Sequence, residues 1–416
     1  MATETNQAGN ENQIRNAAKP SLIVLAGIFC SALSLVLGLI IGISALAVND
    51  GFQANSGLAA DILFHPDLMV FGVIGGLLIT EKLELMENFR IVRGIRISRP
   101  TVTFLFTGVF AASLGIFYDN NYVRFAGLAL IVAASMLFLY YMTSSRNPGQ
   151  PWTKRVFGAS IGAMILAAIA NMGFLIVGNT TITYLALLFP IIYVLAERIE
   201  LGFVRGMKEK TIMIQAFIAW ASVILAFFAT ELGGNASRIP VMYASIILVT
   251  LFVGISVRFD PAFRKGKRTG RFQSFMRFGV ILSYLWLVLG LILFALQMKC
   301  GSGFLDPAAH SIALGFIGTF IVAHSPVIFP LTLKKRAIQN NVSFMPLVML
   351  TVSNVMRVSG DLIARITALG NYLSYLSGYV ILLAIIAFVY NLRRIMAAPI
   401  TQGEEENKSL NGFRKI

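Results

Sequence analysis

A chain of 416 residues that is 57% apolar and only 13% charged lacks the composition of a water-soluble protein, in which about a quarter of the residues are charged. Apolar runs of about 20 residues, each long enough to cross the hydrocarbon core of a bilayer, recur along the whole chain. The formal charge of +15 would suit a nucleic acid, but the basic residues concentrate in alternate loops between these runs. The sequence therefore predicts an integral membrane protein whose surroundings are the lipid bilayer, with no nucleic-acid partner.

Twelve transmembrane helices are predicted in chain order, in an all-α bundle. Barrel strands would be shorter and would alternate in polarity, and a continuous apolar segment in lipid satisfies its backbone polar groups as a helix. A polar N-terminal tail covers 1–20, the transmembrane domain covers 21–393, and a C-terminal tail covers 394–416. The predicted spans are 21–49, 60–81, 101–118, 122–144, 156–178, 182–204, 211–231, 239–257, 277–298, 307–332, 344–367 and 371–392.

Basic residues indicate the orientation of the bundle. Every second connection is rich in Lys and Arg, most clearly the loop at 258–277, whereas the opposite connections hold only Arg124, Arg238 and Lys299. The positive-inside rule then places both termini in the cytoplasm. We expect a multi-pass protein of a prokaryotic cell membrane.

Ionisable residues inside the spans are few, and each is a candidate for function because it is costly in lipid. Only three histidines occur. His65 lies about a turn and a half into the second span and His310 begins the tenth, and both spans run inward from the outer face. The eleventh span runs outward and brings Arg357, Asp361 and Arg365 to the same half. Their i, i+4, i+8 spacing predicts one stripe on a helix face, either an internal ion-pair ladder or a clamp for an anion.

Two neutral imidazoles on separate helices, with arginines nearby, are what a b-type haem requires. We therefore predict His65 and His310 as axial ligands, with Arg357 and Arg365 at the propionates and Asp361 orienting the guanidinium groups. The alternative is that each histidine is only a satisfied polar residue near a helix end.

His324 lies 14 residues after His310, about 21 Å farther along the helix, in the other half of the membrane. It has no histidine partner, so a second haem or a metal there would need another type of ligand. A hydrogen-bonded interior residue and a proton-handling residue are equally open. Glu81 ends the second span, and Glu197 and Glu200 end the sixth. They form either a proton entry near His324 or charges that reach the membrane surface.

These residues resemble a known family. The run HPDLMVF at 65–71 resembles helix two of haem-copper oxidase subunit I, and the run at 310–315 is similar to the tenth helix of that subunit. The resemblance implies a haem between these helices, with Met69 in the haem-binding run. It does not extend to a copper site, because the oxidases need further histidines and only His324 remains. The chain is thus most similar to the NnrS family, a set of haem-containing membrane proteins tied to nitric oxide.

Three functions follow as hypotheses. The first is a membrane haem protein in electron transfer or nitric oxide handling, with an oxidoreductase activity left open and an electron donor that the sequence does not identify. The second is a proton-coupled secondary transporter, with Asp361 and Glu231 as coupling residues. The third is a structural subunit of a larger membrane complex or a homo-oligomer.

Overall fold

The computed structural model describes residues 21–49, 61–88, 98–144, 151–173, 176, 179–204, 206–232, 235–263, 270–301, 303–338 and 341–399. The predicted N-terminal tail at 1–20, most of the predicted C-terminal tail at 394–416, and residues 264–269 of the basic loop at 258–277 lie outside these residues. Within them the chain forms twelve helical rods and one short pair of strands.

Ten of the rods are single helices, and two are built from consecutive segments. The single helices are α2 (Leu22–Asn49), α5 (Ser98–Phe117), α6 (Asn121–Ser144), α7 (Pro151–Gly173), α8 (Thr180–Val204), α9 (Glu209–Glu231), α10 (Asn235–Phe259), α11 (Arg271–Cys300), α14 (Met345–Ile363) and α15 (Leu369–Ile395). The second rod comprises η1 (Asp61–Phe64), η2 (Asp67–Gly75) and α4 (Gly76–Asn88), and the tenth comprises α12 (Leu305–His310), η4 (Ser311–Gly318) and α13 (Thr319–Thr332). A short η3 (Pro261–Phe263) follows α10.

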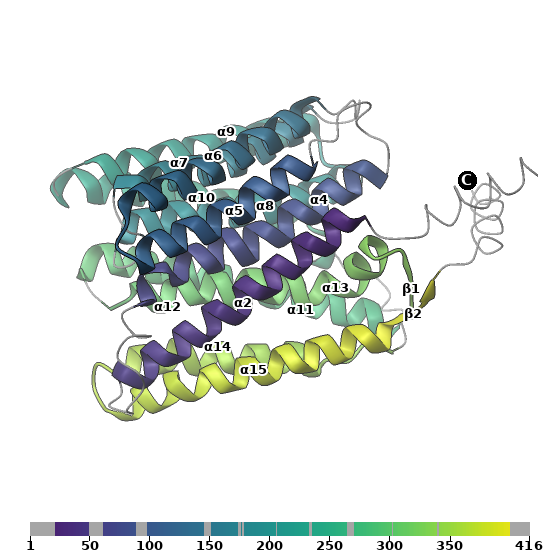
Figure 1. Cartoon of the computed structure of the whole chain (residues 1–416). Coiled ribbons are helices and arrows are strands. Elements are labelled where there is room, and N and C mark those ends of the chain that lie inside the picture. The colour runs from purple at the N-terminus through teal and green to yellow at the C-terminus, as the bar shows by residue number, and fades with distance from the viewer. Residues whose placement is uncertain are drawn as a thin grey trace, which may run out of the picture.

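The bundle is a multi-pass membrane architecture. Within the described ranges, ten helices are long and apolar enough to cross a membrane. The first helix begins and the last helix ends at the same end of the bundle (Figure 1), as an even number of crossings requires. The all-α prediction is confirmed, whereas which side of the membrane holds the termini stays a prediction.

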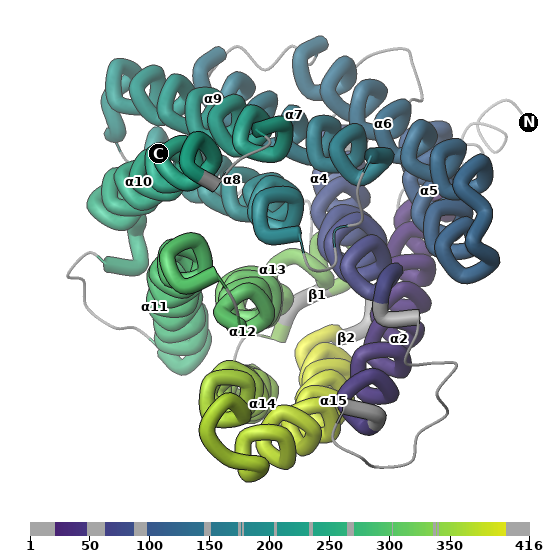
Figure 2. Tube along the Cα trace, turned by 90° about the vertical axis from the view of Figure 1, so that its left-hand side faces the viewer, coloured from purple at the N-terminus to yellow at the C-terminus, as the bar shows by residue number. Residues whose placement is uncertain are grey.

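Burial separates the central helix from the peripheral ones. In α8, 94% of the apolar stretch is buried, compared with 28% in α2 and in α15. Viewed along the rods, the α12–α13 rod lies inside the assembly, surrounded by α8, α11, α14 and α15 (Figure 2). Peripheral helices expose leucine, isoleucine and phenylalanine side chains, as expected of a surface that faces lipid.

Two local features depart from the predicted spans. Helix α14 ends at Ile363, so Arg365 lies in the turn beyond the helix and the predicted stripe holds only for Arg357 and Asp361. The C-terminal tail begins with a strand, β2 (Met396–Pro399), which pairs antiparallel with β1 (Lys335–Ala337) and extends the bundle at that end.

Both candidate ligand histidines lie within two residues of the start of a π-helix. His65 lies two residues before η2, and His310 is the residue before η4. A π-helix bonds each N–H to the fifth preceding carbonyl, is rare, and is frequently found at functional sites. This shared distortion of two otherwise regular rods marks the region around the two histidines as the place to examine for function.

Candidate functional site

One cavity of about 490 Å³ collects most of the predicted site residues. Its volume falls in the range of pockets that hold cofactors and other small ligands. Walls come from α2, the second rod, α8, the tenth rod, α14 and α15. Among the residues that line it are His65, Met69, Asp306, His310 and Arg357, and most of the remaining lining is aliphatic. We call this the His65 cavity.

Helix α2 fixes the orientation of His65. The imidazole Nδ1 lies 2.8 Å from the carbonyl oxygen of Gly38, and because a carbonyl can only accept, Nδ1 carries the proton. The ring fits because α2 has glycine where it passes: a Cβ on Gly42 would lie 3.2 Å from His65 Cε1. This hydrogen bond leaves the other ring nitrogen, Nε2, available for a ligand in the cavity that His65 lines.

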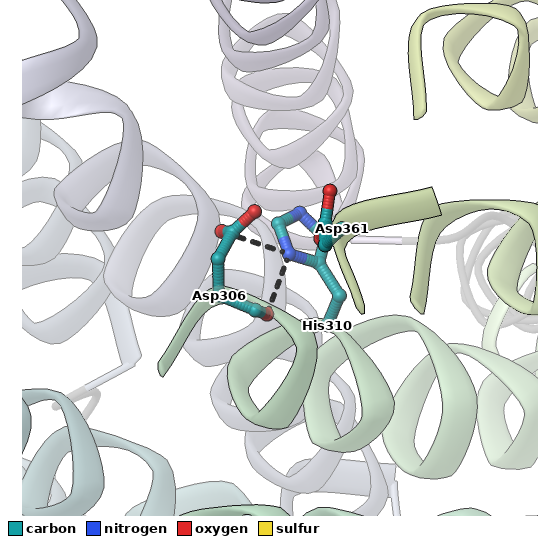
Figure 3. Close-up of side chains that lie close together, drawn as sticks. All are labelled: Asp306, His310 and Asp361. Carbon is teal, nitrogen blue, oxygen red and sulfur yellow. Dashed lines mark hydrogen bonds and ion pairs between the residues drawn. The ribbon is translucent and has the colours of Figure 1, made fainter. Parts of the chain in front are cut away.

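His310 is held in the same manner by its own helix. Its Nδ1 lies 3.0 Å from the carbonyl oxygen of Asp306 and 3.1 Å from Oδ1 of the same residue (Figure 3). A carboxylate behind a histidine fixes the tautomer and increases the basicity of the other nitrogen, as is common for metal-bound histidines. Sequence reasoning missed Asp306, although its spacing of four residues before His310 was a usable signal.

Arg357 joins Asp306 to Asp361. Its Nη2 forms an ion pair with Asp306, and its Nε lies 3.2 Å from Oδ2 of Asp361. Asp361 in turn accepts a hydrogen bond of 2.7 Å from Ser374 on α15. The side chains of Arg357 and Asp361 are only 12% and 13% exposed, whereas that of Asp306 is 53% exposed. This partly buried charge network ends at His310. The predicted ion-pair ladder is thus present, but its members are Asp306, Arg357 and Asp361.

The same side chains offer a set of possible metal ligands. One ligand atom each from Asp306, His310 and Asp361 lies within 4.8 Å of the others, and Figure 3 shows the three side chains converging. However, the Arg357 guanidinium already contacts both carboxylates. Its positive charge opposes a second cation at that place, so the carboxylates are better explained as support for His310.

Met69 and Arg365, which were also predicted as site residues, differ in position. Met69 lines the His65 cavity, and its sulfur packs against Gly38: a Cβ added to Gly38 would lie 2.6 Å from the sulfur. Arg365 is exposed and stacks on the ring of Phe304, 4.2 Å from its centroid. Arg365 is not among the residues that line the cavity, although the neighbouring Gly303 is.

His324 has protein partners for both ring nitrogens. Nδ1 lies 3.0 Å from the carbonyl oxygen of Phe320, and Nε2 lies 3.1 Å from Nη1 of Arg198, which can only donate. Arg198 is in turn paired with Asp260, with both nitrogen–oxygen distances 2.6 Å. This arrangement favours the hydrogen-bonded interior residue over a second haem or metal ligand, because a ligand role would require Arg198 to leave.

Fold and site together describe an all-α, multi-pass membrane protein with a large cavity that two histidines line. The model of a domain of unknown function (DUF8744) matches residues 23–394. The chain therefore belongs to the DUF8744 family, whose model spans nearly all of the helical bundle. A search of curated proteins finds no match.

Proposed function

We propose that this protein is a membrane haem protein that holds one b-type haem in the His65 cavity, with His65 and His310 as axial ligands. One observation carries the proposal: two imidazoles, each anchored through Nδ1 to a backbone carbonyl, line the same cavity of about 490 Å³. Such anchoring leaves Nε2 of both rings available, which is the arrangement that axial ligation needs.

The other lining residues suit this group. The aliphatic walls, among them Leu39, Ile43 and Leu314, would exclude water from a macrocycle. Asp306 would hold His310 in its ligand tautomer, and Arg357 would hold Asp306. Arg357 also remains the residue that we expect nearest to the propionates, and the same role for Arg365 stays a prediction. When bound, the haem would supply an iron that exchanges one electron.

Electron transfer is the role that two filled axial positions favour. Nitric oxide binding, which the resemblance to the NnrS family implies, would require one histidine to leave the iron. We place the protein in a prokaryotic cell membrane with both termini in the cytoplasm, on the basis of the basic loops. In that orientation the His65 cavity lies in the outer half of the bilayer, so the electron donor would act from that side.

A spectrum of the purified protein tests the proposal. The dithionite-reduced minus oxidised difference should show the sharp α-band of a bis-histidine b-type haem, and a pyridine extract should contain haem. His65→Ala and His310→Ala should each abolish the band. His324→Ala serves as the matched control and should retain it, because His324 lies outside the His65 cavity. Size-exclusion profiles would confirm that each variant folds.

Two results would contradict the proposal. A flat spectrum with no extractable haem would favour the secondary transporter, whose substrate would then occupy the same cavity. Loss of haem in the His324 variant alone would show that the ligand pair is wrongly assigned. If metal analysis found a divalent cation instead, the ligands would be the set of Asp306, His310 and Asp361.

A further inference from the structure

His324 lines a second, smaller cavity. Its volume is about 40 Å³, which is enough for roughly two to four water molecules, since a cavity needs about 10–15 Å³ for each. Three rods bring polar side chains to it: Thr80 and Glu81 from α4, Glu197 from α8, and His324 and Thr332 from α13. We call this the Glu81 cavity.

Two threonine hydroxyl groups of this cavity indicate that it holds water. Thr80 and Thr332 are 2% and 4% exposed, and Oγ1 of each has no hydrogen-bond partner within the described part of the chain. Buried hydroxyls are almost always satisfied, and a polar cavity of this size satisfies them with ordered water. Water at this position would also reach the carboxylates of Glu81 and Glu197.

Among the residues that the structure describes, the acidic side chains around the cavity outnumber the basic ones. Two cations lie here, and each has a carboxylate: Lys82 pairs with Glu200 at 3.1 Å, and Arg198 pairs with Asp260 at 2.6 Å. Glu81 and Glu197 are then two further acids in the same buried region, with no ion pair of their own among the described residues.

The other titratable groups nearby do not supply the missing charge. His324 accepts a hydrogen bond from Arg198 on Nε2, so its ring is neutral. Tyr193 donates to the carbonyl oxygen of Leu78, and Tyr284 donates to Asp260. Glu84, on the same helix as Glu81, accepts from Ser21. None of these groups carries a positive charge that would neutralise Glu81 or Glu197.

We propose that the Glu81 cavity is a proton-binding site, in which Glu81 and Glu197 hold one excess proton between them through the enclosed water. Two neighbouring carboxylates in a low-dielectric interior do not both ionise, so one takes a proton. The proton comes from solvent at the Lys82–Glu200 pair, where the Glu200 side chain is 42% exposed. In this step a hydronium ion gives its proton to a carboxylate oxygen and leaves neutral water.

A metal ion fits the Glu81 cavity less well than a proton does. Among the described residues, only Asp306, His310 and Asp361 bring three possible ligand atoms within 4.8 Å of one another. Glu81 and Glu197 are not part of that set, and Arg198 lies beside His324 at 3.1 Å. A proton can be held by one carboxylate and does not need three ligand atoms close together. The inference goes beyond the proposed haem and does not depend on it.

Infrared spectroscopy of the purified full-length protein tests the site directly. At neutral pH, the wild type should show the carbonyl stretch of a protonated carboxylic acid that shifts when water is exchanged for deuterium oxide. This band should be lost or clearly shifted in both Glu81→Gln and Glu197→Gln. Glu231→Gln should leave it unchanged, because Glu231 is an exposed acid at the end of α9.

The result that overturns the proposal is a band absent from the wild type, or one unchanged in either variant. Titration with sodium chloride at constant ionic strength separates a proton from a monovalent cation. The band should not respond to sodium, and its loss on sodium addition would show that a cation displaces the proton. If one variant fails to fold, as judged by size exclusion, the other still decides the question. Haem content does not enter this measurement, so the two proposals fail independently.

Discussion

Replacing Asp260 with alanine should strongly destabilise the bundle, because this carboxylate neutralises a buried guanidinium. Its side chain is 0% exposed and that of Arg198 is 7% exposed. Besides Arg198, the carboxylate accepts hydrogen bonds from the hydroxyl of Tyr284 at 3.1 Å and from the backbone N–H of Ala262 at 2.8 Å. Removing one partner of a buried ion pair costs about 3–5 kcal/mol, since the remaining charge stays buried without compensation.

The free energy of unfolding in mixed detergent micelles measures this cost. The double variant Arg198→Met with Asp260→Ala should be less destabilised than Asp260→Ala alone, because it removes the stranded charge. Glu200→Ala is the matched comparison: its partner is Lys82 and its side chain is 42% exposed, so about 1 kcal/mol or less is expected. A cost below that of Glu200→Ala, or no recovery in the double variant, would refute the reasoning.

Two further predictions concern the His65 cavity. Gly42→Ala should lower haem content per protein, because the new Cβ would lie 3.2 Å from the ring of His65; Gly254→Ala, with nothing within 4 Å of its Cβ, is the control. Arg357→Ala should lose more haem than Arg365→Ala, because only Arg357 lines the cavity, and equal losses in the pyridine assay would contradict this.

Hydropathy was sufficient to predict the rods, because each span must be apolar over its whole length to cross the bilayer. Most predicted ends agree with the observed helices to within a few residues, as for 122–144 and α6 (Asn121–Ser144). The eleventh span was predicted too long, and Arg365 was therefore placed on a helix that has already ended. The π-helices were not predicted, because their register depends on packing between rods, and the sequence pattern does not report it.

Charge partners were predictable only where the spacing was local. The i, i+4 pair of Arg357 and Asp361 follows from the sequence, as would Asp306 and His310. Arg198 and Asp260 are 62 residues apart, and nothing in the local sequence links them. For that reason the sequence left the role of His324 open, whereas the structure gives its Nε2 a donor.

The three histidines show what separates a candidate ligand from an interior residue in this protein. All three have Nδ1 within 3.0 Å of a backbone carbonyl oxygen, so all three carry a proton on Nδ1. They differ at Nε2: that of His324 faces a guanidinium fixed by Asp260, whereas His65 and His310 both line a large apolar cavity. Arg198 could leave His324 only if it also left Asp260, which would bury an unpaired carboxylate. The His324 ring therefore has a structural role. Within the described part of the chain, no guanidinium occupies Nε2 of His65 or His310 in this way. The His65 cavity is therefore where two imidazoles are already oriented to bind an iron.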